Sequence, residues 1–212
     1  QAAKRHDIKS FIYASSASVY GDAKGNIMHE CLVPDPSNHY AISKMTGEHY
    51  TKMYHKVENM NTVCLRYFNV YGPYQNPHSI YGGVIPIFCN LTDEDKPLRI
   101  YGDGKQTRDF TYVDDVAKIT VDCLKDDRSY GKCFNVGLGK EISINDLSDN
   151  FRKIKDNGVE YAGKRTIDNV ERRECDTTYI KSELDFNCEV SLEDGINRTY
   201  EWYSKINKIK VS

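Results

Sequence analysis

Two short apolar runs separated by one helical segment limit what this 212-residue chain can fold into. Residues 8–14 (IKSFIYA) and 62–68 (TVCLRYF) are rich in β-branched and aromatic side chains, which is typical of buried strands. Between them, Ser37 or Asn38 can cap a helix that runs to about Val57. Two strands that are apolar throughout and are joined through a helix predict a parallel sheet covered by helices.

The rest of the chain adds shorter elements to this unit. Capping boxes, Ser143 with Asp146 and Ser191 with Asp194, begin two helices in the last third of the chain. The sequence therefore predicts a sheet with crossover helices, followed by a looser α+β assembly. The other expected elements are the end of a helix at 1–7, a loop at 15–22, helices at 84–91 and 114–124, and strands at 98–101, 110–112 and 132–136.

Composition excludes several classes of protein. The chain is 28% charged and 39% hydrophobic with a formal net charge of −2, so we expect an ordinary globule with no nucleic-acid partner and no membrane partner. The longest stretch without charged side chains, residues 67–92, contains three prolines and cannot form a lipid-spanning helix. Seven cysteines without a C-x-x-C pair predict no disulfide framework, no metal site and reduced thiols in the cytoplasm.

One Tyr–Lys pair is a candidate for acid–base chemistry. Tyr and Lys four residues apart share a helix face, and a protonated Lys can stabilise the phenolate that a general base needs. Three such pairs occur, but two lie in glycine-containing turn sequences (YGDAK, YGDGK), and only Tyr40 with Lys44 lies on the predicted helix. Serines 15, 16 and 18 follow the first strand, so they should reach the same crevice at the carboxyl end of the sheet. The alternative is that these hydroxyls bond only to the backbone of a turn.

Four strings, in this order, carry a resemblance: YASSASVYGD, YAISK, LRYFNVYGPYQNP and GDGKQTRDFTYVDDVA. Together they resemble the extended short-chain dehydrogenase/reductase (NAD-dependent epimerase/dehydratase) family, and within it the UDP-sugar 4-epimerases. The resemblance covers residues 1–139. It implies an α/β fold, namely the C-terminal part of a Rossmann-like doubly wound sheet plus a smaller α+β substrate-binding region. Residues 1–68 and about 113–137 would then form an incomplete NAD-binding domain, and 69–112 and 138–212 the sugar-nucleotide region.

The resemblance also implies a bound NAD and roles for individual residues. Tyr40 corresponds to the base, Lys44 to the residue that binds the nicotinamide ribose and stabilises the phenolate, and Ser16 to the one that binds the substrate hydroxyl. All three also contact the cofactor, and Phe68 lines the nicotinamide unless it is plain core packing. The implied UDP-sugar contacts are Asn69, Val84, Arg99, Tyr101, Arg108, Arg173 and Cys175. For Arg108 the alternative is an ordinary ion pair with Asp109, and for Tyr101 it is plain core packing.

The C-terminal substrate loop departs from the family pattern. The string DNVERREC matches the family through Glu171 and Arg173, but its leading Arg-Pro-Gly is absent and Thr178 replaces an Asp. The second diphosphate-binding Arg is therefore either Arg173 or Arg165. Counting back from Lys181 aligns Cys175 with the position where the family has a residue beside the 2-substituent of the sugar. The resemblance therefore implies that a small side chain there would leave room for an N-acetyl group.

The residues after Ser16 favour one reaction of the family. Dehydratases carry an Asp-Glu pair there and decarboxylases keep the Glu, whereas this chain has Ala17 and Ser18, which cannot act as acid and base at neutral pH. Return of hydride to the other face of a 4-keto sugar needs no further group. We therefore expect 4-epimerisation. The substrate should be UDP-glucose/UDP-galactose or UDP-GlcNAc/UDP-GalNAc, because glucuronate epimerases of the family tend to carry Thr in place of Asn69.

One family feature is missing from the chain. No Gly-rich dinucleotide fingerprint follows a strand and opens a helix, so we expect the segment that holds the adenosine and pyrophosphate of NAD to lie outside these residues. The alternatives to a UDP-hexose 4-epimerase are a UDP-glucuronate epimerase or decarboxylase, a dehydratase, or a non-catalytic nucleotide-binding relative or fragment. A homodimer through the helix that carries Tyr40 is compatible with the sequence, although packing within the chain explains the same apolar residues.

Overall fold

The chain folds into two layers, of which the larger is built on a three-stranded parallel sheet and the second combines helices with short strands. The computed structural model describes residues 1–23, 27–76, 83–163 and 170–211. The sheet consists of β1 (Phe11–Ser16), β2 (Thr62–Tyr67) and β7 (Cys133–Val136), in the order β1-β2-β7. The α/β class and the parallel sheet are confirmed. β1 begins and ends later than predicted because its pairing with β2 runs from Phe11 to Ser16.

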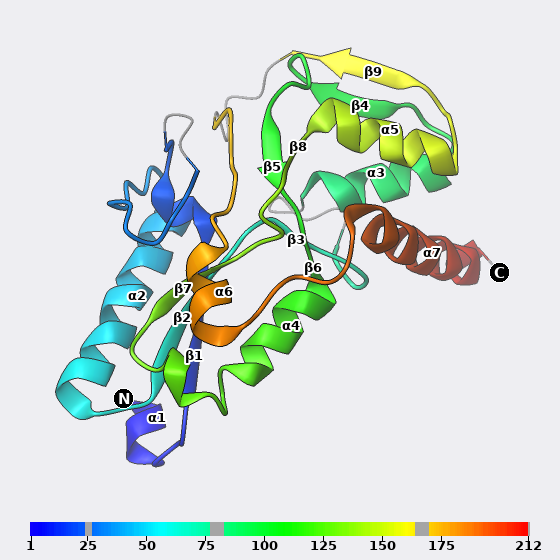
Figure 1. Ribbon diagram of the computed structural model, residues 1–212. Coiled ribbons are helices and arrows are strands. Elements are labelled where there is room, and N and C mark those ends of the chain that lie inside the picture. Colours follow the sequence, from blue (N-terminus) through cyan, green and yellow to red (C-terminus); the bar gives the residue numbers. More distant parts are fainter. Residues whose placement is uncertain (24–26, 77–82, 164–169, 212) are drawn as a thin grey trace.

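Helices cover both faces of this sheet (Figure 1). The helix α2 (His39–Glu58) lies on one face, and its N-cap Asn38 accepts a 2.9 Å hydrogen bond from the Ala41 N–H. On the other face lie α4 (Val113–Asp122) and α6 (Thr178–Leu184). The apolar core on that side joins Val63, Leu65, Phe134, Val136, Val116, Ile119, Ile180 and Phe186. Because Ile180 and Phe186 belong to it, the segment after residue 138 contributes to both layers of the molecule.

The expectation of strands that are apolar throughout is wrong on the α2 face. There the partners in register are Ser15 on β1, Arg66 on β2 and Asn135 on β7, so three polar residues form one row across the sheet. All three are at least 97% buried, as is Glu48 of α2. A buried polar row of this kind requires hydrogen-bond partners, which the neighbouring elements supply.

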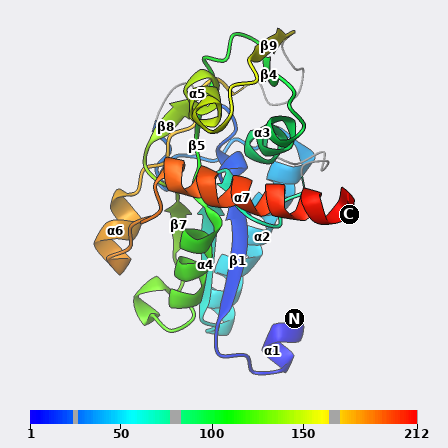
Figure 2. The same ribbon diagram turned by 90° about the vertical axis from the view of Figure 1, so that its right-hand side faces the viewer.

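The second layer packs helices against short strands. Its core contains Phe88 of α3 (Val84–Asp93) and Phe151 of α5 (Ile144–Ile154), whose rings meet edge to face at 5.5 Å. Figure 2 shows α7 (Leu192–Val211) crossing the front of the molecule, with α3 and α5 above it. The remaining elements are β4 (Leu98–Tyr101) parallel to β9 (Val159–Ala162), β5 (Thr107–Asp109) antiparallel to β8 (Glu141–Ser143), and β3 (Val70–Tyr71) parallel to β6 (Thr111–Tyr112).

The predicted helix starts of this layer are confirmed. The Ser143 hydroxyl oxygen accepts the Asp146 N–H at 3.0 Å, and that of Ser191 accepts the Asp194 N–H at 3.1 Å. The expected loop after β1 differs, because Ala17–Tyr20 forms a turn of 3-10 helix, η1, capped by Ser16. A single helical turn, α1 (Ala2–Arg5), precedes β1, and a second short turn, η2 (Asp127–Ser129), precedes β7. Within the described residues, no helix is both long enough and apolar enough to span a membrane.

Candidate active site

Lys44 connects the end of β1 with the start of α2. Its Nζ donates a 2.9 Å hydrogen bond to the Ala14 carbonyl oxygen. The same ammonium lies 5.5 Å from the centroid of the Tyr40 ring and 5.6 Å from that of Tyr13, within the range of cation–π attraction. Tyr40 is in the first turn of α2 and is 45% exposed, so its phenol is accessible to a ligand at the carboxyl end of the sheet.

Ser16 lies at the same end of the sheet, two residues after the Ala14 carbonyl that Lys44 contacts. It is the last residue of β1, and its Oγ accepts a 3.2 Å hydrogen bond from the Ser18 N–H. This contact is the backbone bonding that the turn alternative predicts, and it leaves the hydroxyl hydrogen available to a second acceptor. The structure therefore places Ser16, Tyr40 and Lys44 at the carboxyl end of β1. Ser16 is the last residue of that strand, and the other two lie in the first two turns of α2.

A second group of the predicted residues gathers around Asp109, which is fully buried. Asn69 donates from Nδ2 to the Asp109 backbone oxygen at 2.7 Å, and the Cys175 N–H donates to the Asp109 carboxylate at 3.3 Å. Arg108 is 9% exposed and donates from one terminal nitrogen to the carbonyl oxygens of Thr107 and Val170 at 2.8 and 2.9 Å. Asn69 and Cys175 thus reach Asp109 from two separate segments, whereas the guanidinium of the neighbouring Arg108 contacts the Val170 segment.

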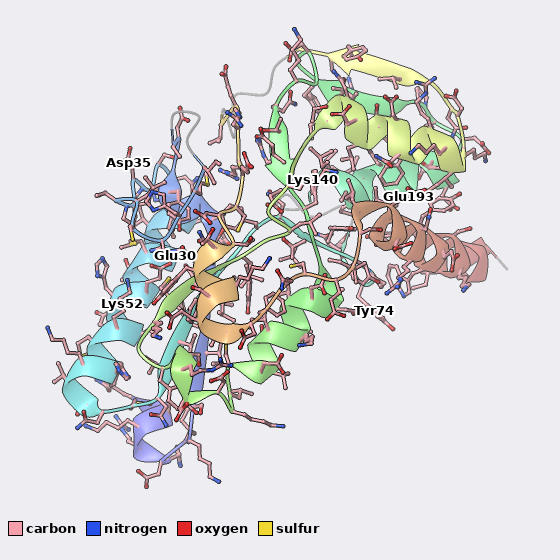
Figure 3. The ribbon with its side chains drawn as sticks, in the orientation of Figure 1. Glu30, Asp35, Lys52, Tyr74, Lys140 and Glu193 are labelled. Carbon is pink, nitrogen blue, oxygen red and sulfur yellow. The ribbon has the colours of Figure 1, made fainter. Side chains whose placement is uncertain are left out.

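The Asp109 carboxylate itself was missed as a site-forming group. It also accepts backbone N–H groups of Leu138 and Gly139 at 2.8 Å and of Lys140 at 3.1 Å. Figure 3 shows Lys140 where the sheet meets the second layer. Asp109 therefore orders the 138–140 loop and the Cys175 segment together, a role that sequence pattern could not separate from an ion pair with Arg108.

Burial raises the pKa of Asp109 to about 6, although four backbone N–H donors oppose the shift. Because the ordinary value is 3.8, the carboxyl stabilises the fold fully below that pH, and its contribution is lost as the pH rises through about 6. The change is on the order of 3 kcal/mol. We expect a ¹³C NMR titration midpoint near 6 for this carboxyl, assigned by the loss of its signal in Asp109→Asn. A midpoint at or below 4 would show instead that the donors dominate.

The remaining predicted contacts are more dispersed. Arg99 and Tyr101 both lie on β4, with the guanidinium carbon 5.7 Å from the ring centroid. Val84 is the first residue of α3 and packs against the core of the second layer. Arg173 is half-buried, whereas Arg165 lies outside the described residues.

Phe68 and Cys175 are in the interior. Phe68 is fully buried, in a cluster that includes Val19, Tyr20 and Met28, and Cys175 is 3% exposed in the same cluster. Cys175 also forms a bridge to Met28 through the backbone. All seven cysteines are free thiols. Among the described residues, no group of His, Cys, Asp and Glu side chains could hold a metal ion.

The sequence and the fold resemble those of known proteins. Residues 1–137 match the NAD dependent epimerase/dehydratase family. The chain belongs to this family. The UDP-N-acetylglucosamine 4-epimerase from Methanobrevibacter ruminantium M1, solved with UDP-N-acetylmuramic acid, has 33% identity and a TM-score of 0.91, over 97% of this chain and 66% of that one.

Two further relatives are named for different reactions of a nucleotide sugar. The UDP-glucuronic acid 4-epimerase from Bacillus cereus, solved with UDP-glucuronic acid and NAD, has 34% identity and a TM-score of 0.87, over 97% of this chain and 64% of that one. The human dTDP-D-glucose 4,6-dehydratase is 33% identical over 209 residues, which are 95% of this chain and 58% of that protein. The chain therefore spans slightly less than two thirds of the length of these relatives.

Ser16, Tyr40 and Lys44, at the carboxyl end of β1, fit part of an NAD molecule. An ammonium has three donors, of which Lys44 directs one to Ala14, and a nicotinamide ribose offers hydroxyl acceptors of the matching kind. The accessible Tyr40 phenol and the Ser16 hydroxyl complete a donor and acceptor set. No Gly-rich strand-to-helix turn occurs among the described residues, so the fit concerns the nicotinamide half of the cofactor only.

Proposed function

We propose that the protein catalyses NAD-dependent 4-epimerisation of a UDP-hexose through a transient 4-keto sugar. The observation that carries the proposal is the Lys44 contact, which joins the Tyr40 ring to the end of the strand that carries Ser16. Tyr40 takes the proton of the sugar 4-hydroxyl, Lys44 stabilises the phenolate and binds the nicotinamide ribose, and Ser16 bonds the same sugar hydroxyl. NAD, held there by Lys44, Tyr40 and Ser16, would supply the acceptor and donor of the C4 hydride.

The residues after Ser16 support epimerisation over dehydration. Elimination of water across C5 and C6 needs an acid and a base, but Ala17 is 97% buried and has no functional group. The Ser18 Oγ is buried, makes no hydrogen bond to a described residue and is not a carboxyl group. A site without these groups can return the hydride to the other face of the keto sugar but lacks the means to expel water.

The sugar nucleotide would occupy the region between the Tyr40 edge and the second layer. We assign the diphosphate to Arg108 with Asn69 and Arg173, because fixed guanidinium and amide donors suit phosphate oxygens. Arg99 and Tyr101 would hold the uracil, and Val84 would border the nucleotide. In this proposal residues 1–68 and about 113–137 belong to the NAD-binding domain, and residues 69–112 and 138–212 to the substrate-binding region.

The test is direct observation of the reaction in the complete gene product that contains this chain. It is incubated with UDP-GlcNAc and with UDP-glucose, and ¹H NMR follows the anomeric and H4 signals. The expected result is conversion to an equilibrium mixture of the 4-epimers without net consumption of NAD. Formation of a 4-keto-6-deoxy sugar would establish a dehydratase, and the absence of turnover with bound nucleotide would favour a non-catalytic binding protein.

Cys175 is proposed to select the substituent at C2 of the sugar. A small side chain leaves room for an N-acetyl group, so Cys175→Tyr should reduce kcat/KM for UDP-GlcNAc at least about tenfold relative to UDP-glucose. Cys175→Ser keeps the size of the side chain and is the matched control. Because Cys175 is 97% buried, the thermal midpoint of each variant is measured alongside. Retention of activity on UDP-GlcNAc by a folded Cys175→Tyr protein would refute this role.

A further inference from the structure

A buried ionic network lies directly behind the candidate catalytic residues. Arg66 donates to both carboxylate oxygens of Glu48, from Nε at 2.8 Å and from a terminal nitrogen at 2.7 Å. The two side chains are 2% and 0% exposed. Burial alone would raise the pKa of the Glu48 carboxyl, but the hydrogen bonds and the charge of Arg66, together with the Ser15 hydroxyl and the charge of Lys52, outweigh it and hold the pKa below its usual range. The pair is therefore ionised in the folded protein.

The network holds the chain on both sides of Ser16. The Ser15 hydroxyl donates to the Glu48 carboxylate at 2.6 Å. Beyond Ser16, the short helix η1 ends at Tyr20, whose hydroxyl oxygen accepts a 2.8 Å hydrogen bond from Arg66. The same Tyr20 hydroxyl donates to Asn135 on β7 at 2.7 Å. Ser16 is thus fixed by its neighbours, through one carboxylate and one guanidinium.

The same carboxylate fixes the helix that carries the other two candidates. Glu48 lies one turn after Lys44 and two turns after Tyr40 on α2. Successive turns of α2 are therefore tied to successive residues of β1, because Lys44 donates to Ala14 and Glu48 accepts from Ser15. A slip of α2 along β1 would break both contacts at once.

We infer that Glu48 and Arg66 are positioning residues, which set the placement of Ser16 relative to Tyr40 and Lys44; this inference rests on the proposed function. Neither side chain is accessible to substrate, so any effect on turnover acts through the residues they hold. Stability alone does not account for the pair, because well-packed apolar side chains of similar volume are often as stabilising as a buried ion pair.

The decisive variant is the double replacement Glu48→Met with Arg66→Met in the complete gene product. It removes both charges and keeps a similar side-chain volume, so the protein should stay folded. Ser15 loses its hydrogen bond to Glu48, and Tyr20 loses the one from Arg66 while it keeps Asn135. We expect kcat for the UDP-sugar to fall about 100-fold with KM changed less than threefold, since a small displacement of reacting groups costs about this much. Glu48→Asp, which keeps the charge but shortens the reach, should give an intermediate loss.

Asp115→Asn is the matched control. Asp115 is a 96% buried carboxylate on α4, on the opposite face of the sheet, where it accepts the N–H groups of Glu189 and Val190. This variant should keep kcat per folded molecule. The positioning role is overturned if a folded double variant retains wild-type kcat, or if both its kcat and that of Asp115→Asn fall only with the folded fraction.

Hydrogen exchange separates this inference from the proposed function. Mass spectrometry should show faster exchange of segments 15–21 and 39–48 in the double variant and no change there in Asp115→Asn. If the wild-type protein epimerises no UDP-sugar, the proposed function fails, whereas faster exchange still supports the positioning of the three side chains. Unchanged exchange in a folded double variant refutes it.

Discussion

Tyr40→Phe is expected to lower kcat for the UDP-sugar by about 10²–10⁴-fold, the usual contribution of a positioned acid–base group. The substitution removes only the phenolic oxygen, so the ring that faces Lys44 at 5.5 Å remains. Tyr40 is 45% exposed, and the protein should keep its fold and its nucleotide affinity. The measurement is initial-rate kinetics on the complete gene product, with NMR detection of the 4-epimer.

Tyr13→Phe is the matched control for that experiment. The Tyr13 ring lies 5.6 Å from the same ammonium, but its hydroxyl donates only a long 3.5 Å hydrogen bond to the Ser43 carbonyl oxygen. Removal of this hydroxyl should therefore leave kcat within about threefold of wild type, which is the size of losing one weak hydrogen bond. A Tyr40→Phe protein that keeps more than a tenth of wild-type kcat would exclude Tyr40 as the base.

Arg66→Met is expected to destabilise the protein by about 3–5 kcal/mol, the range for removing one partner of a buried pair. Glu48 would be left fully buried with the Ser15 hydroxyl as its remaining side-chain donor. The double variant with Glu48→Met removes the stranded charge, so most of the loss should be recovered. Urea unfolding at pH 7 measures both effects, and a double variant that is no more stable than Arg66→Met would contradict this account.

The pH dependence of the Glu48–Arg66 pair has a definite sign. Arg66 holds the pKa of Glu48 below its ordinary value of 4.5, so the stability from this shift is present above pH 4.5. It is lost as the pH falls through the lower folded value. The stability difference between wild type and the double variant should therefore shift against wild type below pH 4.5. Asp109 contributes the opposite sign at higher pH, which is why the comparison uses the same protein background.

Local patterns in the sequence predicted much of the framework. The runs at 62–68 and 98–101 are strands as expected, and the capping boxes at Ser143 and Ser191 begin helices. The short strands β3, β5, β8 and β9 and the helix α6 were missed. Each has seven residues or fewer and depends on pairing or packing with distant segments, so its own residues carry little periodic signal.

Part of the candidate site was also predicted from local sequence patterns, and part was not. The spacing of Tyr40 and Lys44 predicted a shared helix face. The structure brings the Tyr40 ring and the Lys44 ammonium together near the end of β1. Asp109 could not be recognised, because its four backbone donors come from residues 138–140 and 175. The donors of a buried carboxylate are set by how loops meet, and a single sequence does not record where loops meet.

The sequence by itself determined the α/β class, the family resemblance and the three residues proposed for catalysis, because short-range periodicity and motif strings encode them. Only the tertiary structure decided that Arg66 lies in one row with Ser15 and Asn135, and that Glu48 joins this row from α2. The physical reason is that strand register and helix docking select which distant polar groups become buried together. A buried charge is tolerated only where that selection supplies its partner.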